Sequence, residues 1–163
     1  MEIKTQVVSK EGKKFDIVYR EGNPEIELNG VFLNGVSGHC FYGNKMVIVH
    51  DEKSGWWFPG GGIEKNETPE EAVVREVKEE SNMKVLFQRY IGYQTLTDEY
   101  GKINRHASYF CVVKPYGDFV SDPDEDITEI KLIDPKDYKQ YIRWGEVGDR
   151  IMEVAMKMEE KMK

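Results

Sequence analysis

This sequence has few cysteines, no long apolar run and no excess of basic residues. The chain has two cysteines, Cys40 and Cys111, and neither belongs to the paired spacing of a zinc site or of a disulfide framework. This pattern excludes a small scaffold held by disulfides. It predicts two buried free thiols in a protein of a reducing compartment.

No stretch of the sequence is long and apolar enough to cross a bilayer, and the polar first residues do not resemble a signal peptide. We therefore expect a cytoplasmic protein that does not bind membranes. The formal charge of −7 provides no overall basic footprint for a phosphate backbone, so we expect no duplex nucleic acid as a partner. Small phosphorylated molecules chelated by a metal are more natural partners.

A length of 163 residues suits one domain with one well-buried core. The sequence shows no internal repeat and no low-complexity linker. We predict a single domain over residues 1–163, with N-terminal strands in 1–30 and a C-terminal helix over 146–162.

A dense set of carboxylates follows a glycine turn in residues 61–83, which read GGIEKNETPEEAVVREVKEESNM. Because residues three and four apart share a helix face, Glu76, Glu79 and Glu80 should project from one side of one helix. Carboxylates this close repel one another unless a cation lies among them, and hard oxygen ligands suit Mg²⁺ or Mn²⁺. The spacing therefore predicts a divalent metal site.

The same segment carries the signals of a helix start. Thr68 stands at the N-cap, Pro69 at the first helical position and Glu71 at the third, which together form a capping box. Glu70 and Glu71 lie near the positive end of the helix dipole, so we give them a structural role. The apolar stripe that should pack this helix against a sheet consists of Ala72, Val73 and Val77.

The segment resembles the Nudix box, whose pattern is G-x5-E-x7-R-E-U-x-E-E-x-G-U, with U a bulky aliphatic residue. The positions that match are Gly61, Glu67, Arg75, Glu76, Val77, Glu79, Glu80 and Met83. Asn82 stands where the pattern has its second glycine. Asparagine tolerates the left-handed conformation of a helix C-cap, so this departure bears on stability more than on chemistry.

The resemblance implies a set of metal ligands. In similar enzymes the main-chain carbonyl just before the box, here that of Gly60, ligates a metal together with the box carboxylates, here those of Glu76, Glu79 and Glu80. Mg²⁺ is the expected ion, with Mn²⁺ as an alternative.

The resemblance also implies an internal ion pair between Glu67 and Arg75. In this role the acid fixes the loop against the helix and steers the arginine away from the metal ions. Both residues would be architectural.

The implied reaction is Mg²⁺-dependent hydrolysis of the pyrophosphate linkage in a nucleoside diphosphate joined to another group, by attack of metal-activated water. We predict a nucleoside triphosphate as the substrate. ADP-ribose or another nucleotide sugar is one alternative, because the N-terminal strands could support a homodimer instead of a monomer, as in some sugar-nucleotide members. The other is a catalytically silent Nudix-like module that senses a ligand.

The general base has two possible sources in this family, the box helix and a loop elsewhere in the chain. Glu76 and Glu79 are the helix candidates. In the acidic run 122–126 we favour Glu125, provided that its carboxylate reaches the proton it must take. The alternative for this run is an ordinary solvated turn.

Aromatic and basic side chains outside the box should select the substrate. Trp56, Trp57 and Phe58 immediately precede the glycine loop. We expect at least two of the three to pack in the core and one tryptophan to be able to stack on a base. The candidate substrate contacts are Trp56, Phe58, Tyr93 and Arg105, with packing or solvent exposure as the alternative for each.

Periodicity predicts the remaining elements. We expect strands over residues 15–19, 26–28, 31–42, 46–50, 85–96, 104–113 and 127–133, a turn over 98–102 and a short helix that starts within 134–137. The fold class is α/β in the broad sense (α+β), and the resemblance implies an α/β/α sandwich with a mixed, largely antiparallel sheet between helices.

Overall fold

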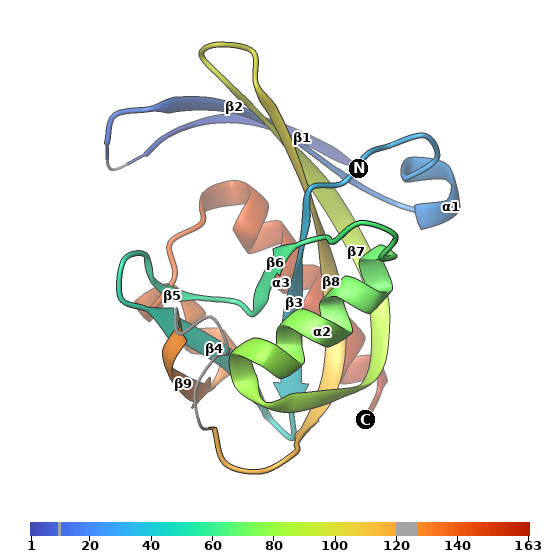
Figure 1. Ribbon diagram of the computed structural model, residues 1–163, viewed down its shortest axis with the longest axis vertical. Helices are drawn as coiled ribbons and strands as arrows, with labels where there is room; N and C mark the ends of the chain where they lie inside the picture. Colours follow the sequence, from blue (N-terminus) through green and yellow to red (C-terminus); the bar gives the residue numbers. More distant parts are fainter. Residues whose placement is uncertain (10, 120–126) are drawn as a thin grey trace.

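A computed structural model describes residues 1–9, 11–119 and 127–163, and in this part of the chain nine strands form one mixed sheet (Figure 1). The strands are β1 (Glu2–Val8), β2 (Lys14–Glu21), β3 (Gly35–Tyr42), β4 (Lys45–Asp51), β5 (Gly55–Trp57), β6 (Gly60–Gly62), β7 (Met83–Asp98), β8 (Ile103–Pro115) and β9 (Ile127–Ile133). The helical elements are α1 (Pro24–Glu27), α2 (Pro69–Ser81), the 3-10 helix η1 (Pro135–Gln140) and α3 (Gly145–Lys161).

The order along the sheet is β1-β2-β7-β8-β3-β4-β5, with β6 paired to β3 and β9 paired to β4. The central pair, β3 and β8, is parallel, and the other pairs are antiparallel. The predicted mixed and largely antiparallel sheet is therefore confirmed.

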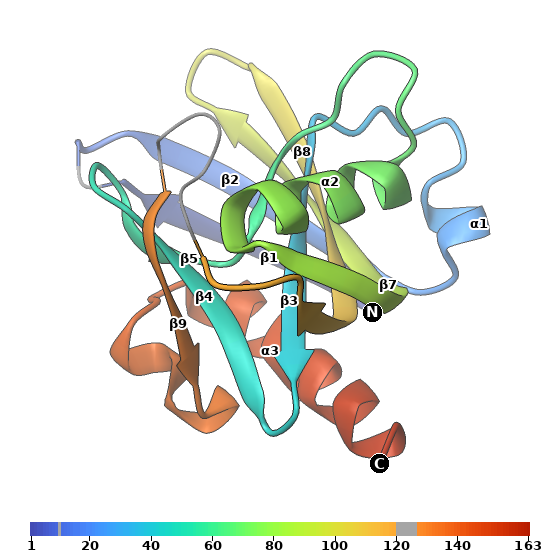
Figure 2. The ribbon, with the colours of Figure 1, turned by 60° about the horizontal axis from the view of Figure 1, so that its bottom comes forward.

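Helices α2 and α3 cover opposite faces of this sheet (Figures 1 and 2). Under α2, Val73 and Val77 pack with buried residues of β3 and β8 such as Val36 and Tyr109. On the other face, α3 packs a second buried cluster through Val147, Ile151, Met152 and Ala155. These two cores give the α/β/α layers that the sequence predicts. The core under α2 holds this helix next to β3, the strand with which the glycine strand β6 pairs.

Local side-chain bonds set both ends of α2 as the sequence predicts. Thr68 Oγ1 accepts from the backbone N–H of Glu71 at 3.1 Å, and Glu71 Oε1 accepts from the backbone N–H of Thr68 at 3.0 Å. At the other end Asn82 adopts the left-handed conformation with φ 54°. Asparagine thus takes the place of glycine at this C-cap.

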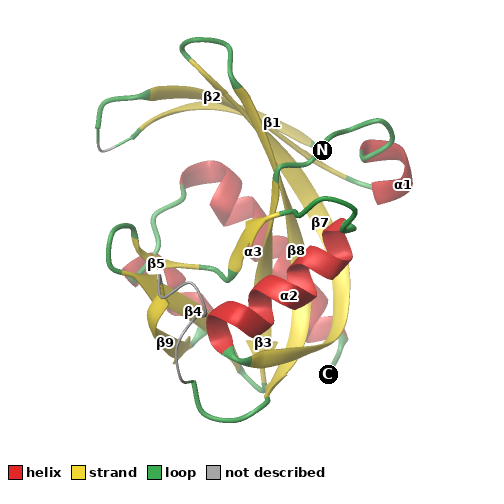
Figure 3. Cartoon of the chain, viewed as in Figure 1, coloured by secondary structure: helices red, strands yellow, loops and turns green. Residues whose placement is uncertain are grey.

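Most of the predicted elements are present, and the differences lie near the N-terminus (Figure 3). The strand predicted over 26–28 is wrong, because Asn23 caps a short helix there by accepting from the backbone N–H of Glu25 at 2.9 Å, with Pro24 at the first position. The strand predicted over 31–42 begins only at Gly35. Strands β1, β5 and β6 had no individual prediction.

The N-terminal hairpin β1-β2 is joined to the C-terminal helix by charged groups. Glu21 on β2 accepts two hydrogen bonds from Arg150 Nε on α3, both at 3.1 Å, and a further one from the Arg150 guanidinium. The hydroxyl of the fully buried Tyr19 donates to Glu21 at 2.7 Å. These bonds hold β2 to α3.

Cys40 and Cys111 are buried and free, as predicted, and face each other in register on β3 and β8. In the described part of the chain no helix is both long and apolar enough to cross a membrane.

Candidate active site

The glycine loop before α2 is held between a strand and the helix. Gly60, Gly61 and Gly62 form β6 and pair with Ser37, Val36 and Gly35 of β3. The backbone N–H of Gly60 donates to Glu80 Oε1 at 2.8 Å, which ties the loop to the end of the helix. This bond keeps Gly60, whose carbonyl is the predicted main-chain ligand, next to the Glu80 carboxylate.

Gly61 leaves room for the carboxylate of Glu76. A Cβ atom built on Gly61 would lie 2.5 Å from Glu76 Oε1 and 2.8 Å from Oε2, which is too close for any real contact. Glu76 therefore occupies the space that a side chain at position 61 would need. The absence of a side chain here is a packing requirement of the site.

The ion pair between Glu67 and Arg75 is present and has two parallel hydrogen bonds. Arg75 Nε donates to Glu67 Oε2 at 2.7 Å and Nη2 donates to Glu67 Oε1 at 2.8 Å. Hydrogen bonding from Arg75 lowers the pKa of Glu67 to about 2 and raises the pKa of Arg75 in turn. Nη2 also donates to the Gly62 carbonyl at 2.9 Å, so the arginine joins loop to helix.

The same guanidinium also contacts two of the predicted metal ligands. Arg75 Nη1 donates to Glu76 Oε1 at 2.7 Å and to Glu79 Oε2 at 3.4 Å. The expectation that Glu67 steers the arginine away from the metal ions stays a prediction, and here Arg75 bonds to two of the carboxylates that would hold them. The attraction between these carboxylates and the guanidinium favours this contact.

Whether a divalent cation fits here depends on the oxygen atoms of the helix carboxylates and of the Gly60 carbonyl. Glu76, Glu79 and Glu80 lie on one helix face beside the Gly60 carbonyl, and all of their ligand atoms are hard oxygens. Within residues 1–9, 11–119 and 127–163, no group of three acidic, imidazole or thiol side chains stands close enough to hold a metal as arranged. The chemistry of these oxygens fits Mg²⁺ or Mn²⁺, and to hold such an ion the three carboxylates would have to lie closer together, with Arg75 released from Glu76 and Glu79.

A cavity of about 330 Å³ opens beside these carboxylates and includes both Glu80 and Gly60 in its wall. Trp57 lines it, with 37% of its surface exposed. Asp51, the last residue of β4, and Ser54, from the β4-β5 turn, line it as well. Sequence reasoning missed these two residues, because their proximity to Glu80 comes from pairing between strands.

The predicted substrate contacts lie in different places. Trp56 is on β5 but packs against His50 and Tyr141, at ring-centroid distances of 5.0 and 6.0 Å. Phe58 lines the cavity, yet it is only 2% exposed and belongs to the core. Packing for two of the three neighbouring aromatics, as expected, is therefore confirmed.

Tyr93 and Arg105 are away from this cavity. Tyr93 is 5% exposed and lies in the core cluster under α2. Arg105 donates its backbone N–H to Asn34 Oδ1 at 2.8 Å. A substrate contact by either residue stays a prediction. Glu125 lies outside the described residues, so its role as general base also stays a prediction.

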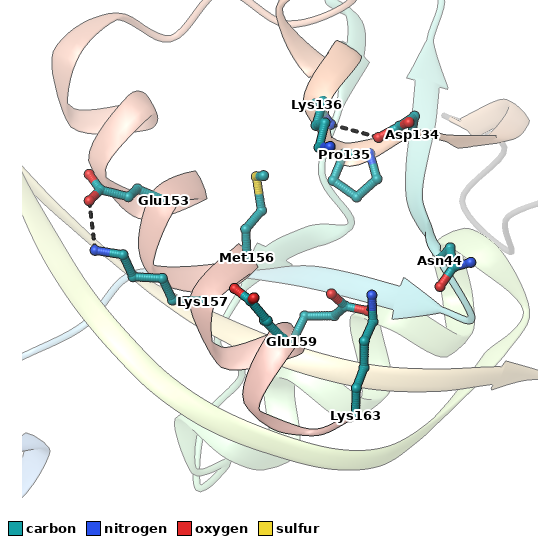
Figure 4. A pocket seen from close by; sticks show the side chains of 10 residues that line it. Asn44, Asp134, Pro135, Lys136, Glu153, Met156, Lys157, Glu159 and Lys163 are labelled. Atoms are coloured by element: carbon teal, nitrogen blue, oxygen red, sulfur yellow. Dashed lines mark hydrogen bonds and ion pairs between the residues drawn. The ribbon is translucent and has the colours of Figure 1, made fainter.

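A second hollow lies against α3, on the face of the sheet opposite α2 (Figure 4). Its volume is about 670 Å³, and its wall includes Asn44, Asp134, Met156 and the ion pair of Glu153 with Lys157 at 2.8 Å. Because α2 and its carboxylates are on the other face, this hollow is separate from the candidate active site.

Curated relatives match part of the chain. A Bacillus subtilis (strain 168) protein provisionally named the 8-oxo-dGTP diphosphatase YtkD is 36% identical over 83 residues, which are 44% of this chain and 52% of that protein. An RNA pyrophosphohydrolase of Hydrogenovibrio crunogenus is 35% identical over 63 residues, which are 39% of this chain and 35% of that protein. The chain thus spans about half or less of the length of these relatives.

Solved structures share the fold over more of the chain. A Listeria monocytogenes protein provisionally named a NUDIX hydrolase aligns with TM-score 0.62 and 15% identity, over 80% of this chain and 97% of that one. The NUDIX domain of Shewanella oneidensis NrtR, complexed with ADP ribose, aligns with TM-score 0.59 and 16% identity, over 85% and 99%. The family model described as NUDIX domain matches residues 33–153. With the box in place between β6 and β7, the chain belongs to the Nudix hydrolase family.

Proposed function

We propose that this protein is a Mg²⁺-dependent hydrolase that cleaves the pyrophosphate linkage of a nucleoside triphosphate. One observation carries the proposal. A single face of α2 presents Glu76, Glu79 and Glu80 to a glycine loop that is itself bonded to Glu80. This arrangement combines a carboxylate cluster with a backbone that a phosphate can approach closely.

The carboxylates and the Gly60 carbonyl are the groups that would hold the cation, and Nudix hydrolases generally use divalent metal ions. A cation at this position supplies the positive charge that polarises phosphate oxygens. Arg75 can leave Glu76 and Glu79 without leaving the loop, because Glu67 and the Gly62 carbonyl hold the rest of its guanidinium.

The proton of the attacking water needs an acceptor within hydrogen-bond reach. Glu76 and Glu79 are the candidates on the helix, and Glu125 is the candidate from the loop. Glu80 is less suited to this role because its bond to the Gly60 N–H ties the loop to the helix, whereas Glu76 and Glu79 bond to Arg75, which can release both. We therefore assign the base to one of the other three.

The choice of a nucleoside triphosphate is supported by the names of the relatives. The Bacillus subtilis protein is named for 8-oxo-dGTP, and the Hydrogenovibrio crunogenus protein is named for RNA pyrophosphohydrolysis. The alternative substrate class is ADP-ribose or another nucleotide sugar, for which some family members act as homodimers. In the described part of the chain β1 lies at one edge of the sheet. Such an edge could pair with a second copy in a homodimer.

A ligand-sensing module without activity is the alternative from a different class. The NrtR domain shares the fold and was crystallised with ADP ribose. The intact set of Glu76, Glu79 and Glu80 argues for hydrolysis, since a sensor has no need of three repelling carboxylates on one helix face.

Product release from a panel of substrates tests the proposal. The panel contains nucleoside triphosphates including 8-oxo-dGTP, ADP-ribose, nucleotide sugars and 5′-triphosphorylated RNA, each with Mg²⁺, with Mn²⁺ and with chelator. Metal-dependent release of pyrophosphate from nucleoside triphosphates is the expected result. Cleavage of ADP-ribose alone would favour the alternative substrate class. Binding of a nucleotide without any cleavage would favour the sensor.

A further inference from the structure

Trp57 is an exposed aromatic side chain beside Glu80 of the carboxylate cluster. It lines the same cavity of about 330 Å³ as Glu80 and Gly60 and keeps 37% of its surface exposed. A volume near the lower end of the roughly 300–1,000 Å³ typical of ligand pockets suits a single ring system. The cavity therefore has room for one base beside the proposed phosphate site.

The sheet determines which way Trp57 points. It stands opposite Val49 on β4, and its neighbour Trp56 stands opposite His50. Since successive side chains of a strand face opposite sides, Trp57 shares a face with Val49 and Asp51, both of which line the cavity. Trp56 points to the other face, where it joins the core under α3.

Two neighbouring aromatic rings hold the Trp57 indole in place. Its ring centroid lies 5.7 Å from that of Phe58, at 65°, and 5.3 Å from that of Trp144, at 61°. Both contacts are edge-to-face, the arrangement that aromatic pairs favour. Phe58 is itself almost completely buried, so the indole rests on a rigid support. A ring held in this way loses little side-chain freedom when it binds a ligand.

We propose that Trp57 is the stacking surface for the nucleobase of the substrate and that it favours purine nucleotides over pyrimidine nucleotides. A purine presents the larger ring system to the indole, and stacking on an aromatic side chain strengthens with the overlapping area. This inference rests on the proposed function, because the phosphates of the same nucleotide would lie at Glu80 and Gly60.

Two further side chains complete the base site. Ile127 supplies an apolar contact in the cavity wall. Asp51 lies in the wall with Oδ1 accepting the backbone N–H groups of Lys53 and Ser54, at 2.7 and 3.1 Å. These bonds lower the pKa of Asp51, so its carboxylate is an acceptor for N–H groups on a base edge.

The test compares Trp57→Leu, which removes the aromatic ring, with Trp57→Phe, which keeps one. Tyr100→Leu is the matched control, because Tyr100 is 94% exposed at the β7-β8 turn and away from the cavity. Binding is measured by calorimetry with a non-hydrolysable GTP analogue, the UTP counterpart and inorganic tripolyphosphate, all with Mg²⁺. Thermal unfolding of each variant shows that it is folded.

Trp57→Leu should weaken binding of the GTP analogue by about 5- to 150-fold, the range expected for loss of one base-aromatic stack. Trp57→Phe should retain most of the affinity, and Tyr100→Leu should match the wild type. Tripolyphosphate, which has no base, should bind all four proteins equally. The preference of the wild type for the GTP analogue over the UTP analogue should shrink in Trp57→Leu.

Equal affinity of Trp57→Leu and wild type for the GTP analogue would overturn the inference, and so would an equal loss for tripolyphosphate. Failure of the proposed function gives a different result. If the wild type binds the GTP analogue through Trp57 but cleaves no triphosphate, the base site stands and the hydrolase assignment falls. If the wild type cleaves GTP and Trp57→Leu cleaves GTP with the same KM, the proposed hydrolase is supported and the proposed base site is wrong.

Discussion

Gly61→Ala should disable the candidate active site without unfolding the protein. The added Cβ would lie 2.5 Å from Glu76 Oε1, 2.6 Å from its Cδ and 2.8 Å from Oε2. An ordinary contact begins at 3.4 Å, so the carboxylate must retreat by roughly 0.6–0.9 Å. Because it is the far end of a flexible side chain, this move should change the free energy of unfolding by less than about 1 kcal/mol.

The effect on turnover should be much larger than the effect on stability. A displacement near 1 Å at a catalytic or metal-binding group can cost on the order of 100-fold in rate. We expect kcat/KM for the best triphosphate of the panel to fall by about that factor. Mn²⁺ affinity, measured by calorimetry without nucleotide, should fall by about 10-fold or more.

Gly62→Ala is the matched control, one residue further along the same strand. The nearest atom to its added Cβ is the Asn34 carbonyl oxygen at 3.8 Å, an ordinary contact. This variant should keep its activity within about threefold and its stability within about 0.5 kcal/mol, as for surface changes in general. Equal activity of Gly61→Ala and Gly62→Ala, with both folded, would refute the view that Glu76 must occupy this space.

Four further predictions concern the charged groups of the box and the C-terminal end of α2. Glu67→Gln should lower the free energy of unfolding by about 1–3 kcal/mol at pH 7 in chelator, measured by urea titration. The control Glu64→Gln changes a side chain that is 68% exposed, so it should change the free energy of unfolding by less than about 0.5 kcal/mol. Similar values for both variants would contradict the ion-pair argument. Folding lowers the pKa of Glu67 from 4.5 to about 2. The ionised carboxylate therefore stabilises the folded protein above about pH 5, and this stabilisation is lost as the pH falls through about 2. The free energies of unfolding of the wild type and of Glu67→Gln should converge in acid. Glu79→Gln combined with Glu80→Gln should abolish metal-dependent turnover and keep the thermal unfolding midpoint within a few degrees, and undiminished turnover would remove both residues from the site. Asn82→Gly should leave the rate per folded molecule within about threefold, since it keeps the left-handed C-cap and removes one hydrogen bond, from Asn82 Nδ2 to the Asp118 carbonyl at 3.0 Å. A loss of orders of magnitude in a steady-state assay would show a larger role.

Features that depend on nearby residues could be predicted from the sequence. The ends of α2 follow from Thr68, Pro69 and Asn82, which bond to groups within a few positions along the chain. β9 occupies the predicted residues, and Asp134 and Pro135, which follow it, start the 3-10 helix η1. These signals need no knowledge of the tertiary structure.

Features that depend on pairing between distant segments could not be predicted. Trp56 and Trp57 are chemically identical neighbours, and only the register of β5 on β4 decides which one faces Glu80. The contact of Arg75 with Glu76 and Glu79 depends on how far the guanidinium extends across the helix face. The short helix α1 replaced a predicted strand because the capping bond at Asn23 outweighed a brief apolar alternation.

The parallel pairing of β3 with β8 also has a consequence for how the chain folds. Gly35 lies opposite His106 and Phe41 opposite Val112, so the partners in the middle of the sheet are about 70 residues apart in sequence. Loop-closure entropy opposes such pairing until the intervening segment is ordered, and chains rich in non-local contacts fold slowly, in milliseconds to seconds. The intervening segment contains the glycine loop and α2. We therefore expect the central pairing and the proposed catalytic helix to form together, because α2 lies in the segment that joins the two strands.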